Sequence, residues 1–588
     1  MRHLLIILSF FLSLFLSAQT IYEGTHKSFG HEDNYSIALP SEPGWADDYF
    51  IGGTHWQSTP PSPYLSRLKR VDILGDILWD NDLSLYDGAG ILMNNRTLHV
   101  EDSPFWLGGS TIGVGYLENA TNNGLIYGVK DNGDLAQPQE FVPVAGGDTE
   151  HEEFVHVDEV TDENGNLLGW IVVGNSKSAV PGANNRAVLL SYISSTGAVL
   201  WTIHLGSGND GAPIDWDYGS NVLHIPGHGF FVSGSGNIYD PNSMSYKQGA
   251  IATLIGYGGA IIWHHIYTHS IDSYDTVSAS AFYDETEGTI FQIANGQGDP
   301  TFLENGFSLN AFKVTSGQML PEYRRNFYLD NKALKGMTVQ PAQTGDNIVV
   351  SGFVDMPKPP IGTSAWPNGL MGQDHPPFLM EFSRLMDNSG STVMWNKVYP
   401  VESAGYGWTT ADAYEIYSNM NQPLFYHPEM LTQNLDSSTY TLVGLHEEGS
   451  GAFDLEFIHT DIHGDALCDE ETLDIIEVVK QIDVGGPPMV DFKEYQLINV
   501  PWDLVANQPD NIPCDICDPN LSMTVVADCD EVTISLVYAG DIASVCLHIN
   551  WGDGTTDDVP ASDVITHVFA TGFTGGDVCV TSFCCGFS

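Results

Sequence analysis

Alternating apolar and polar residues mark three short strands between Gly169 and Gly206, and the same pattern recurs along most of the chain. Period-two alternation and β-branched residues indicate strands, and a tight turn containing Gly indicates a hairpin. Each recurrence has a strand that ends near Gly, a variable polar loop, a second strand, a Gly turn and a further strand. The three strands of the best-defined copy are expected at Trp170–Gly174, Ala187–Ile193 and Ala198–Leu205.

The turn glycines of the recurring unit are 58 to 74 residues apart. An all-strand unit repeated at this spacing predicts radial or linear repetition. In four copies a Trp follows the turn Gly by four or five residues, which predicts either docking between neighbouring units or ordinary core packing. The turn glycines are Gly75, Gly133, Gly197, Gly259, Gly317, Gly390 and Gly464, and the tryptophans are Trp79, Trp201, Trp263 and Trp395.

Repeats made only of strands must protect their sheet edges, and closing the units into a ring does so. We therefore predict an all-β chain with a seven-bladed β-propeller over residues 19–500. A strand from Gln19–Asp48 or from Thr472–Val500 would complete the terminal blade, and Ile475–Val479 and Glu494–Val500 are candidates within the second segment. An open β-solenoid fits less well, because its rungs are usually shorter than these units.

A Pro- and Asp-rich stretch at residues 501–519 predicts a linker, and residues 520–588 read as a small β-sandwich with strands separated by turns. Trp551-Gly552-Asp553-Gly554 and the downstream His567–Gly572 resemble the turn motifs of a polycystic kidney disease (PKD) domain, an immunoglobulin-like sandwich. The resemblance implies a structural role for these residues, with the glycines allowing the turn.

The repeats themselves resemble those of secreted bacterial propeller proteins, in which a strand ending in Gly precedes an apolar strand, a G-x-x-x-W turn and a hydrophobic strand. The matching segments here are GWIVVG with LLSYISSTGAVLW, and GFFVSG with ATLIGYGGAIIW. The turns also resemble the tryptophan-docking motif of quinoprotein dehydrogenases, but no set of basic and metal-liganding residues for that cofactor is identifiable. The turns lack the Asp of sialidase propellers, and cationic residues for a substrate carboxylate are scarce.

The chain carries 20 Lys and Arg against 75 Asp and Glu, a formal net charge of −55. Such a surface repels phosphate backbones and anionic membranes, so we expect no nucleic-acid partner and no membrane insertion. Met1–Ala18, with Arg2 and His3 before an apolar run, predicts a secretory signal peptide cleaved after Ala18. We expect a secreted or cell-surface protein.

All eight cysteines lie at or after Cys468, which predicts disulfides confined to the C-terminal part of an exported chain. Cys514-Asp-Ile-Cys517 stands in a Pro/Asp-rich segment without a second CxxC or a nearby His. A structural disulfide is therefore favoured there over redox or zinc chemistry.

Two polar clusters are candidates for chemistry. His264, His265, Tyr267 and His269 lie on one expected strand, and two of the histidines could join a metal site, although strand-surface histidines are the simpler interpretation. Glu150–Glu153 with His156, Asp158, Glu159 and Asp162 could bind Ca²⁺ but lacks the spacing of a calcium loop, which favours a solvated loop. Asp162–Asn166 is expected to be a hairpin turn.

From these patterns we expect an exported, non-catalytic protein that binds glycan or protein at the cell surface, with the PKD-like module as spacer or adhesive. No catalytic, cofactor-binding or metal residue is assigned, no cofactor is expected, and a structural Ca²⁺ is the one ion considered. Recognition would sit on the variable loops, such as Asn175–Arg186 and Phe353–Pro377. The alternative is a secreted polysaccharide hydrolase or lyase that uses the axial funnel of the propeller.

Overall fold

The computed structural model is built from strands throughout the part of the chain that it describes. It describes residues 152–176, 187–206, 217–240, 245–268, 275–297, 306–320, 325–329, 333–342, 347–355, 377–383, 392–399 and 452–465, Tyr323, and elsewhere the strands alone. Within these residues no helix is present that has the length and apolarity to cross a membrane. The expected signal peptide, the Cys514–Cys517 pair and His269 lie outside the described residues.

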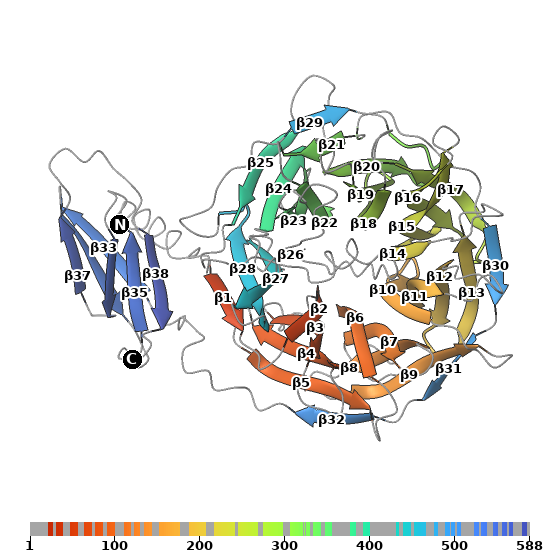
Figure 1. Cartoon of the computed structure of the whole chain (residues 1–588), viewed down its shortest axis with the longest axis horizontal. Helices are drawn as coiled ribbons and strands as arrows, with labels where there is room; N and C mark the ends of the chain where they lie inside the picture. The colour runs from red at the N-terminus through yellow and green to blue at the C-terminus, as the bar shows by residue number, and fades with distance from the viewer. Residues whose placement is uncertain are drawn as a thin grey trace, which may run out of the picture.

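The chain forms antiparallel sheets that follow one another around a ring, with a smaller group of strands to one side (Figure 1). Two of these sheets, one over residues 218–267 and one over residues 275–328, are joined by the single parallel pair Gln248↔Asp275. The strands of the ring up to residue 206 are β1 (Tyr22–His26), β2 (His31–Ala38), β3 (Asp48–Trp56), β4 (Tyr64–Asp72), β5 (Ile77–Leu85), β6 (Ile91–His99), β7 (Thr111–Glu118), β8 (Asn123–Val129), β9 (Leu135–Pro143), β10 (Glu152–Thr161), β11 (Leu167–Ser176), β12 (Ala187–Ser194) and β13 (Val199–Gly206).

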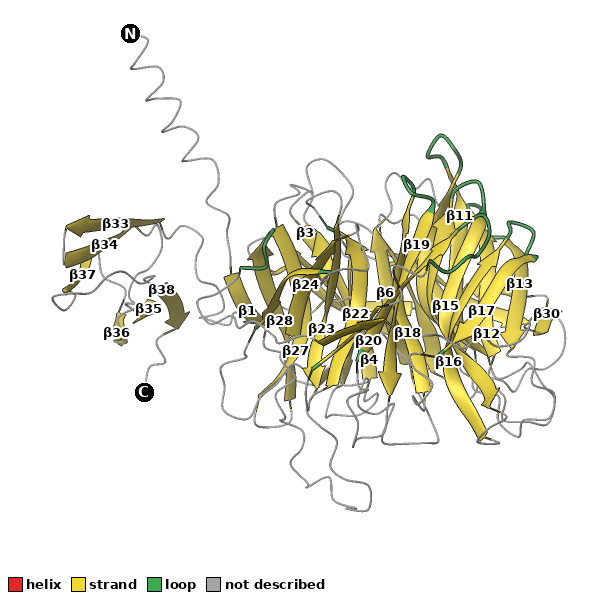
Figure 2. Ribbon diagram, turned by 90° about the horizontal axis from the view of Figure 1, so that it is seen from above, coloured by secondary structure: helices red, strands yellow, loops and turns green. Residues whose placement is uncertain are grey.

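The ring continues with β14 (Tyr218–Ile225), β15 (Gly229–Asp240), β16 (Ser245–Ile255), β17 (Ile261–Tyr267), β18 (Asp275–Asp284), β19 (Thr289–Gln297), β20 (Phe307–Lys313), β21 (Arg325–Tyr328), β22 (Ala333–Pro341), β23 (Asn347–Asp355), β24 (Pro377–Ser383), β25 (Val393–Val398), β26 (Leu431–Gln433), β27 (Thr439–Glu448) and β28 (Ala452–Asp461). Consecutive strands pair as hairpins within each sheet, from an innermost strand such as β10 or β14 outward. Seen from above, the sheets stand side by side as one thick layer (Figure 2).

The ring is closed by its first strand. β1 pairs antiparallel with β28, the last strand of the ring, from Tyr22↔His459 to His26↔Leu455. This is the role expected of a strand from Gln19–Asp48. Because β1 and β28 lie more than 400 residues apart in sequence, the pairing joins the two ends of the ring.

A later segment runs around the outside of the ring, and we call it the outer belt. It consists of β29 (Ile476–Val479), β30 (Met489–Lys493), β31 (Tyr495–Asn499) and β32 (Trp502–Ala506), which pair with β21, β13, β9 and β5 respectively. The two candidates named above for completing the terminal blade, Ile475–Val479 and Glu494–Val500, thus form strands at the outer edges of other sheets. β32 lies inside the segment read as a linker.

Apolar side chains fill the space between neighbouring sheets. One core joins Val173, Leu190 and Ile203 of the β10–β13 sheet to Val232 and Ile251 of the β14–β17 sheet. A second core joins Phe307 and Phe327 to Phe378 and Phe382 of the β22–β25 sheet. Face-to-face burial of this kind is the arrangement that the alternating pattern predicted, and it is typical of propeller folds.

A close backbone contact explains why glycine stands near the end of the second strand of a sheet. A Cβ added at Gly174, Gly234 or Gly352 would lie 1.8–1.9 Å from the carbonyl oxygen of Glu153, Tyr218 or Lys335 on the innermost strand. Each of these carbonyls stands next to a bulge in that strand, which turns it toward the glycine. The strand-ending glycine is therefore required by close backbone approach.

The tryptophans that follow the turns dock onto the next sheet. The indole Nε1–H of Trp201 donates to the Tyr257 carbonyl at 2.8 Å, and that of Trp263 donates to the Val314 carbonyl at 2.8 Å. Both acceptors lie in the turn of the neighbouring sheet. The prediction of docking between units is confirmed for these two residues, whereas Trp395 donates to Glu381 of its own sheet.

The strands to one side of the ring form two three-stranded sheets. β33 (Ser522–Asp528), β34 (Glu531–Val537) and β37 (Val564–Val568) form one, and β35 (Val545–Asn550), β36 (Thr556–Pro560) and β38 (Cys579–Cys584) form the other. An all-β C-terminal part is thereby confirmed. Trp551–Gly554 lies outside the described residues.

Candidate functional site on the innermost strands

The innermost strands share an irregularity at corresponding positions. In six of them, β2, β6, β10, β14, β18 and β22, the register with the next strand shifts a few residues from the start of the strand. Bulges re-aim side chains and are common beside functional sites. The shifts fall between Asp33 and Tyr35, Asn94 and Arg96, Phe154 and His156, Gly219 and Asn221, Ser278 and Ala281, and Gly336 and Thr338.

Carboxylate groups are buried at the start of two neighbouring innermost strands. Glu152 and Glu153 open β10, and Asp217 immediately precedes β14; Glu152 and Asp217 are 0% exposed and Glu153 is 8% exposed. Glu153 Oε1 accepts a hydrogen bond from Asn175 Nδ2 at 3.0 Å, and Asn175 Oδ1 accepts one from the Gly219 amide at 3.1 Å. Asn175 therefore connects Glu153 with the strand that follows Asp217.

His156 lies at the bulge of β10 and faces β14. Asn221 Nδ2 lies 3.0 Å from His156 Nε2, and the Val222 amide lies 3.4 Å from His156 Nδ1. A neutral imidazole accepts at one nitrogen only, so rotating the Asn221 amide to present Oδ1 to Nε2–H lets both ring nitrogens bond. His156 is then held as a neutral imidazole between two strands.

A second histidine, His224, lies at the other end of the interface between β10 and β14. His224 Nδ1 accepts from the Thr161 amide at 3.5 Å, His224 Nε2 lies 2.9 Å from the Tyr257 hydroxyl, and the His224 amide donates to Asp158 Oδ2 at 2.6 Å. Burial lowers the pKa of His224 to about 4 and raises that of Tyr257. The interface between β10 and β14 thus contains ionisable groups along its whole length.

A related arrangement joins the β18–β21 sheet to β22. The Gly336 amide donates to Asn295 Oδ1 at 2.9 Å, and Asn295 Nδ2 donates to the Gly336 carbonyl at 2.8 Å. Lys335 Nζ donates to the Gly296 carbonyl at 3.0 Å. Asn295 thus plays the part of Asn175. The asparagine bridge is a shared structural device, while Glu152, Glu153 and Asp217 are buried at the starts of β10 and β14, and His156 lies on β10.

The structure corrects the expectation for the acidic run. Glu152–Thr161 is the innermost strand β10, and Glu152, Glu153 and His156 are buried, so the run is not a solvated loop. The bulge in β10 interrupts the alternation of apolar and polar residues, so the sequence pattern did not indicate a strand there. Asp162–Asn166 is confirmed as a hairpin turn: Gly165 has φ of 80°, and bonds from Asn166 hold the pKa of Asp162 below its usual value.

The expected histidine cluster is distributed over two faces of β17. His264 Nδ1 lies 2.7 Å from Thr253 Oγ1, and burial lowers the pKa of His264 to about 4. His265 Nε2 donates to the Gly317 carbonyl at 2.7 Å, and Tyr267 donates to Gln292 at 2.7 Å. Across the described residues, no group of three or more His, Cys, Asp or Glu side chains is placed to hold a metal ion.

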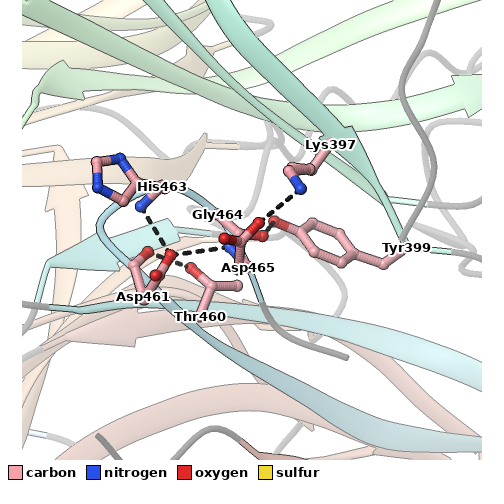
Figure 3. Close-up of polar contacts among 7 residues, drawn as sticks. All are labelled: Lys397, Tyr399, Thr460, Asp461, His463, Gly464 and Asp465. Carbon is pink, nitrogen blue, oxygen red and sulfur yellow. Dashed lines mark hydrogen bonds and ion pairs between the residues drawn. The ribbon is translucent and has the colours of Figure 1, made fainter. Parts of the chain in front are cut away.

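Polar contacts between the last two sheets of the ring lie in a turn and serve packing (Figure 3). The Lys397 ammonium lies 2.5 Å from Asp465 Oδ1, and the Tyr399 hydroxyl donates to the Gly464 carbonyl at 2.7 Å. Asp461 Oδ1 accepts from the amides of His463 and Asp465 at 2.7 and 2.9 Å. These contacts are local turn bonds, one inter-sheet ion pair and one inter-sheet hydrogen bond, and the buried groups of β10 and β14 are the candidate site.

Comparison with known proteins gives structural neighbours only. No family model and no curated protein matches the chain. A mutant puromycin hydrolase in complex with PGG superposes with a TM-score of 0.33 and 10% identity over 86% of this chain and 58% of its own. The endosialidase of phage phi92 superposes with a TM-score of 0.35 and 10% identity over 94% of this chain and 88% of its own.

Both of these structures are of enzymes by their titles, so the comparisons contradict the expectation of a non-catalytic binding protein, and we do not retain it. The chain spans little more than half of the hydrolase. At these TM-scores the likeness identifies neither a reaction nor a residue.

Proposed function

We propose that the chain is an exported hydrolase that cleaves a polysaccharide at the end of the ring where the innermost strands begin. The observation that carries the proposal is the burial of Glu153 and Asp217 at the starts of two adjacent innermost strands, with Asn175 bonded to both strands. Hydrolysis of a glycosidic bond generally uses two carboxyl groups, one as proton donor and one as base or nucleophile. Buried ionisable groups are candidates for such work.

The neighbouring His156 and Glu152 support this role. The imidazole of His156 is held in place by Asn221 and the Val222 amide, and a positioned general acid or base contributes about 10²–10⁴-fold to rate. A lyase would use the same histidine as a base and would leave an unsaturated sugar. The product therefore separates the two reactions.

The substrate that this site favours is neutral or amine-bearing. A net charge of −55 and carboxylates at the starts of β10 and β14 repel an anionic glycan. Recognition of a sugar carboxylate ordinarily takes arginine, whereas Lys335 on a nearby innermost strand is buried and donates to the Gly296 carbonyl. An anionic polymer should be the poorest substrate.

The finer assignments belong to the same proposal. We take the ring to be a seven-bladed propeller, which the successive sheets and the β1–β28 closure support, and the C-terminal strands to be a PKD-like module that holds the enzyme near its substrate. The hydrolysis requires no cofactor, and Ca²⁺ would have a structural role only. The glycan is the partner.

The test is release of reducing ends from neutral, amino and anionic polysaccharides by the full chain. Glu153→Gln and Asp217→Asn should each lower the rate about 10²–10⁴-fold because each removes a proton-transfer group. Glu163→Gln, at an exposed position of the β10–β11 turn, is the matched control and should retain full activity.

Release of no sugar from any of these polymers by the folded wild-type protein would contradict the proposal. Equal activity of the Glu153 and Asp217 variants and the wild type would also contradict it. Release of an unsaturated sugar would show that the enzyme is a lyase and not a hydrolase.

A further inference from the structure

The turn ends of the β10–β13 and β14–β17 sheets carry a cluster of aromatic side chains. This end of the ring lies opposite the starts of the innermost strands, and Figure 2 shows its loops beside β11 and β13. The ring centroid of Phe230 lies 5.8 Å from that of Trp201 and 5.4 Å from that of Tyr257. Phe230 is buried, Trp201 is partly exposed and Tyr257 is 38% exposed. Two aromatic side chains from neighbouring sheets therefore rest on one buried ring and reach the surface. The four turns at this end all lie within the described residues, at 162–166, 195–198, 226–228 and 256–260.

Hydrogen bonds from both sheets fix the orientation of Tyr257. The Gly227 amide donates to its hydroxyl oxygen at 3.1 Å, and Trp201 donates to its carbonyl at 2.8 Å. His224 Nε2 lies 2.9 Å from the same hydroxyl oxygen. Because His224 Nδ1 accepts from the Thr161 amide, a neutral imidazole carries its proton on Nε2 and donates there. The exposed ring is thus held in place before a ligand arrives, which lowers the entropic cost of binding.

An aromatic side chain at this place is not needed to dock the sheets. Trp263 makes the equivalent docking bond to the Val314 carbonyl, in a turn that contains no aromatic residue. Packing of the sheets therefore does not account for an exposed aromatic ring at position 257. Four turns have a glycine with positive φ after the third strand of a sheet, and the residue two positions before that glycine is Tyr257 in one of them and Ser195, Thr315 and Ile462 in the others.

Apolar side chains are also exposed at this end of the two sheets. Leu168, Leu200 and Ile262 are 42%, 52% and 50% exposed. A rigid aromatic ring with one exposed side, accompanied by apolar groups, suits a ligand that is apolar on one face and polar at its rim. A sugar ring has such a face, formed by its C–H groups. The net charge of −55 disfavours anionic ligands, so the surface favours a neutral sugar chain.

We propose that Trp201 and Tyr257 form a non-catalytic binding site for a neutral polysaccharide chain. The exposed rings pack against sugar rings of the chain, and recognition depends on this stacking because the hydroxyl of Tyr257 is already bonded within the protein. The choice of a polysaccharide rests on the function proposed above. The site holds the polymer at the turn end while the opposite end of the ring cleaves it. Each contact is weak, but a polymer presents many equivalent sugars, which raises their effective concentration at the site.

Electrophoresis of the full chain in native gels that contain hydroxyethylcellulose, glycol chitin or galactomannan tests the proposal. The wild type should be retarded in at least one of these neutral gels and not in a gel of the anionic polymer alginate. Tyr257→Leu should raise the dissociation constant about fivefold or more, because the aromatic ring is lost. Tyr257→Phe loses the same hydroxyl but keeps the ring, and should stay within about twofold of the wild type. Met394→Ala removes an exposed apolar side chain from another sheet and should leave migration unchanged.

Retardation of the wild type in none of the neutral gels would refute the proposal. So would equal retardation of the wild type and Tyr257→Leu, or equal losses in Tyr257→Leu and Tyr257→Phe. A gel that contains polylysine represents a basic protein partner, and retardation that depends on Tyr257 only in that gel would overturn the assignment to a glycan.

Sugar release is measured separately, so the two proposals can fail independently. Retardation that depends on Tyr257, without release of sugar, would contradict the hydrolase alone. Release of sugar, with retardation that Tyr257→Leu leaves unchanged, would contradict this binding site alone.

Discussion

At the scale of the residue, glycine and tryptophan form one unit at each docked turn. Gly197, Gly259, Gly317 and Gly464 all have φ between 65° and 83°, a region that suits glycine. A Cβ at Gly317 would also lie 2.6 Å from Trp263 Cγ, and one at Gly464 would lie 2.6 Å from the Trp395 ring. The glycine of the G-x-x-x-W pattern is therefore required for two reasons. The turn needs a positive φ, and the indole of the preceding sheet packs directly against the glycine.

These two constraints can be separated by mutation. Gly317→Ala should destabilise the chain by about 1–2 kcal/mol from backbone strain, with about 1–3 kcal/mol more from the clash with Trp263. Gly227→Ala is the control, because Gly227 has φ of 75° but no atom within 4 Å of the added Cβ. Chemical denaturation measures both, and equal losses for the two variants would show that the indole contact adds nothing.

At the scale of the element, the innermost strands β10 and β14 combine a bulge near their start with buried polar side chains. The contact between β10 and β14 depends on neutral histidines that accept backbone N–H groups, as His224 Nδ1 accepts from Thr161. Protonation of that nitrogen replaces an acceptor with a donor. The interface between these strands should therefore respond to acid.

The stability of the chain should fall as pH is lowered from 6.5 toward 4. Burial holds the pKa of His224 at about 4 in the folded state against an ordinary value of 6.5, so the unfolded chain binds more protons in this window. His224→Gln should reduce the acid-induced fall in thermal midpoint. His463→Gln, in an exposed turn, should leave the fall unchanged, and an identical fall in both variants would argue against His224.

At the scale of the whole molecule, two segments distant in sequence hold the ring. β1 joins the end of the ring to its beginning, and the outer belt ties four sheets together from outside. Neither segment can do this before the sheets have formed, because the edges with which they pair belong to those sheets.

Replacing residues 22–26 with a Gly/Ser segment of equal length should open the ring. Loss of the β1–β28 ladder should cost about 0.5–1.5 kcal/mol for each hydrogen bond removed. The expected results are a lower thermal midpoint and faster proteolysis within β28. An unchanged midpoint would mean that the belt alone keeps the ring closed.

The sequence by itself determined the local structure: the strands, the turn glycines and the docking tryptophans, because alternation, positive φ and an indole of large area each leave a signature in a few consecutive residues. It indicated three strands of most sheets and missed innermost strands such as β10, in which a bulge interrupts the alternation. The acidic run was consequently read as a loop.

Only the tertiary structure decided which residues lie together. Glu153 and Asp217 are 64 residues apart in sequence, and they form a candidate site because two sheets stack and Asn175 bonds across them. The positions of β1 and the outer belt were likewise decided by free sheet edges, which exist only after folding. A sequence pattern specifies what one strand will bury, whereas the partner of an edge or of a buried carboxylate depends on the whole ring.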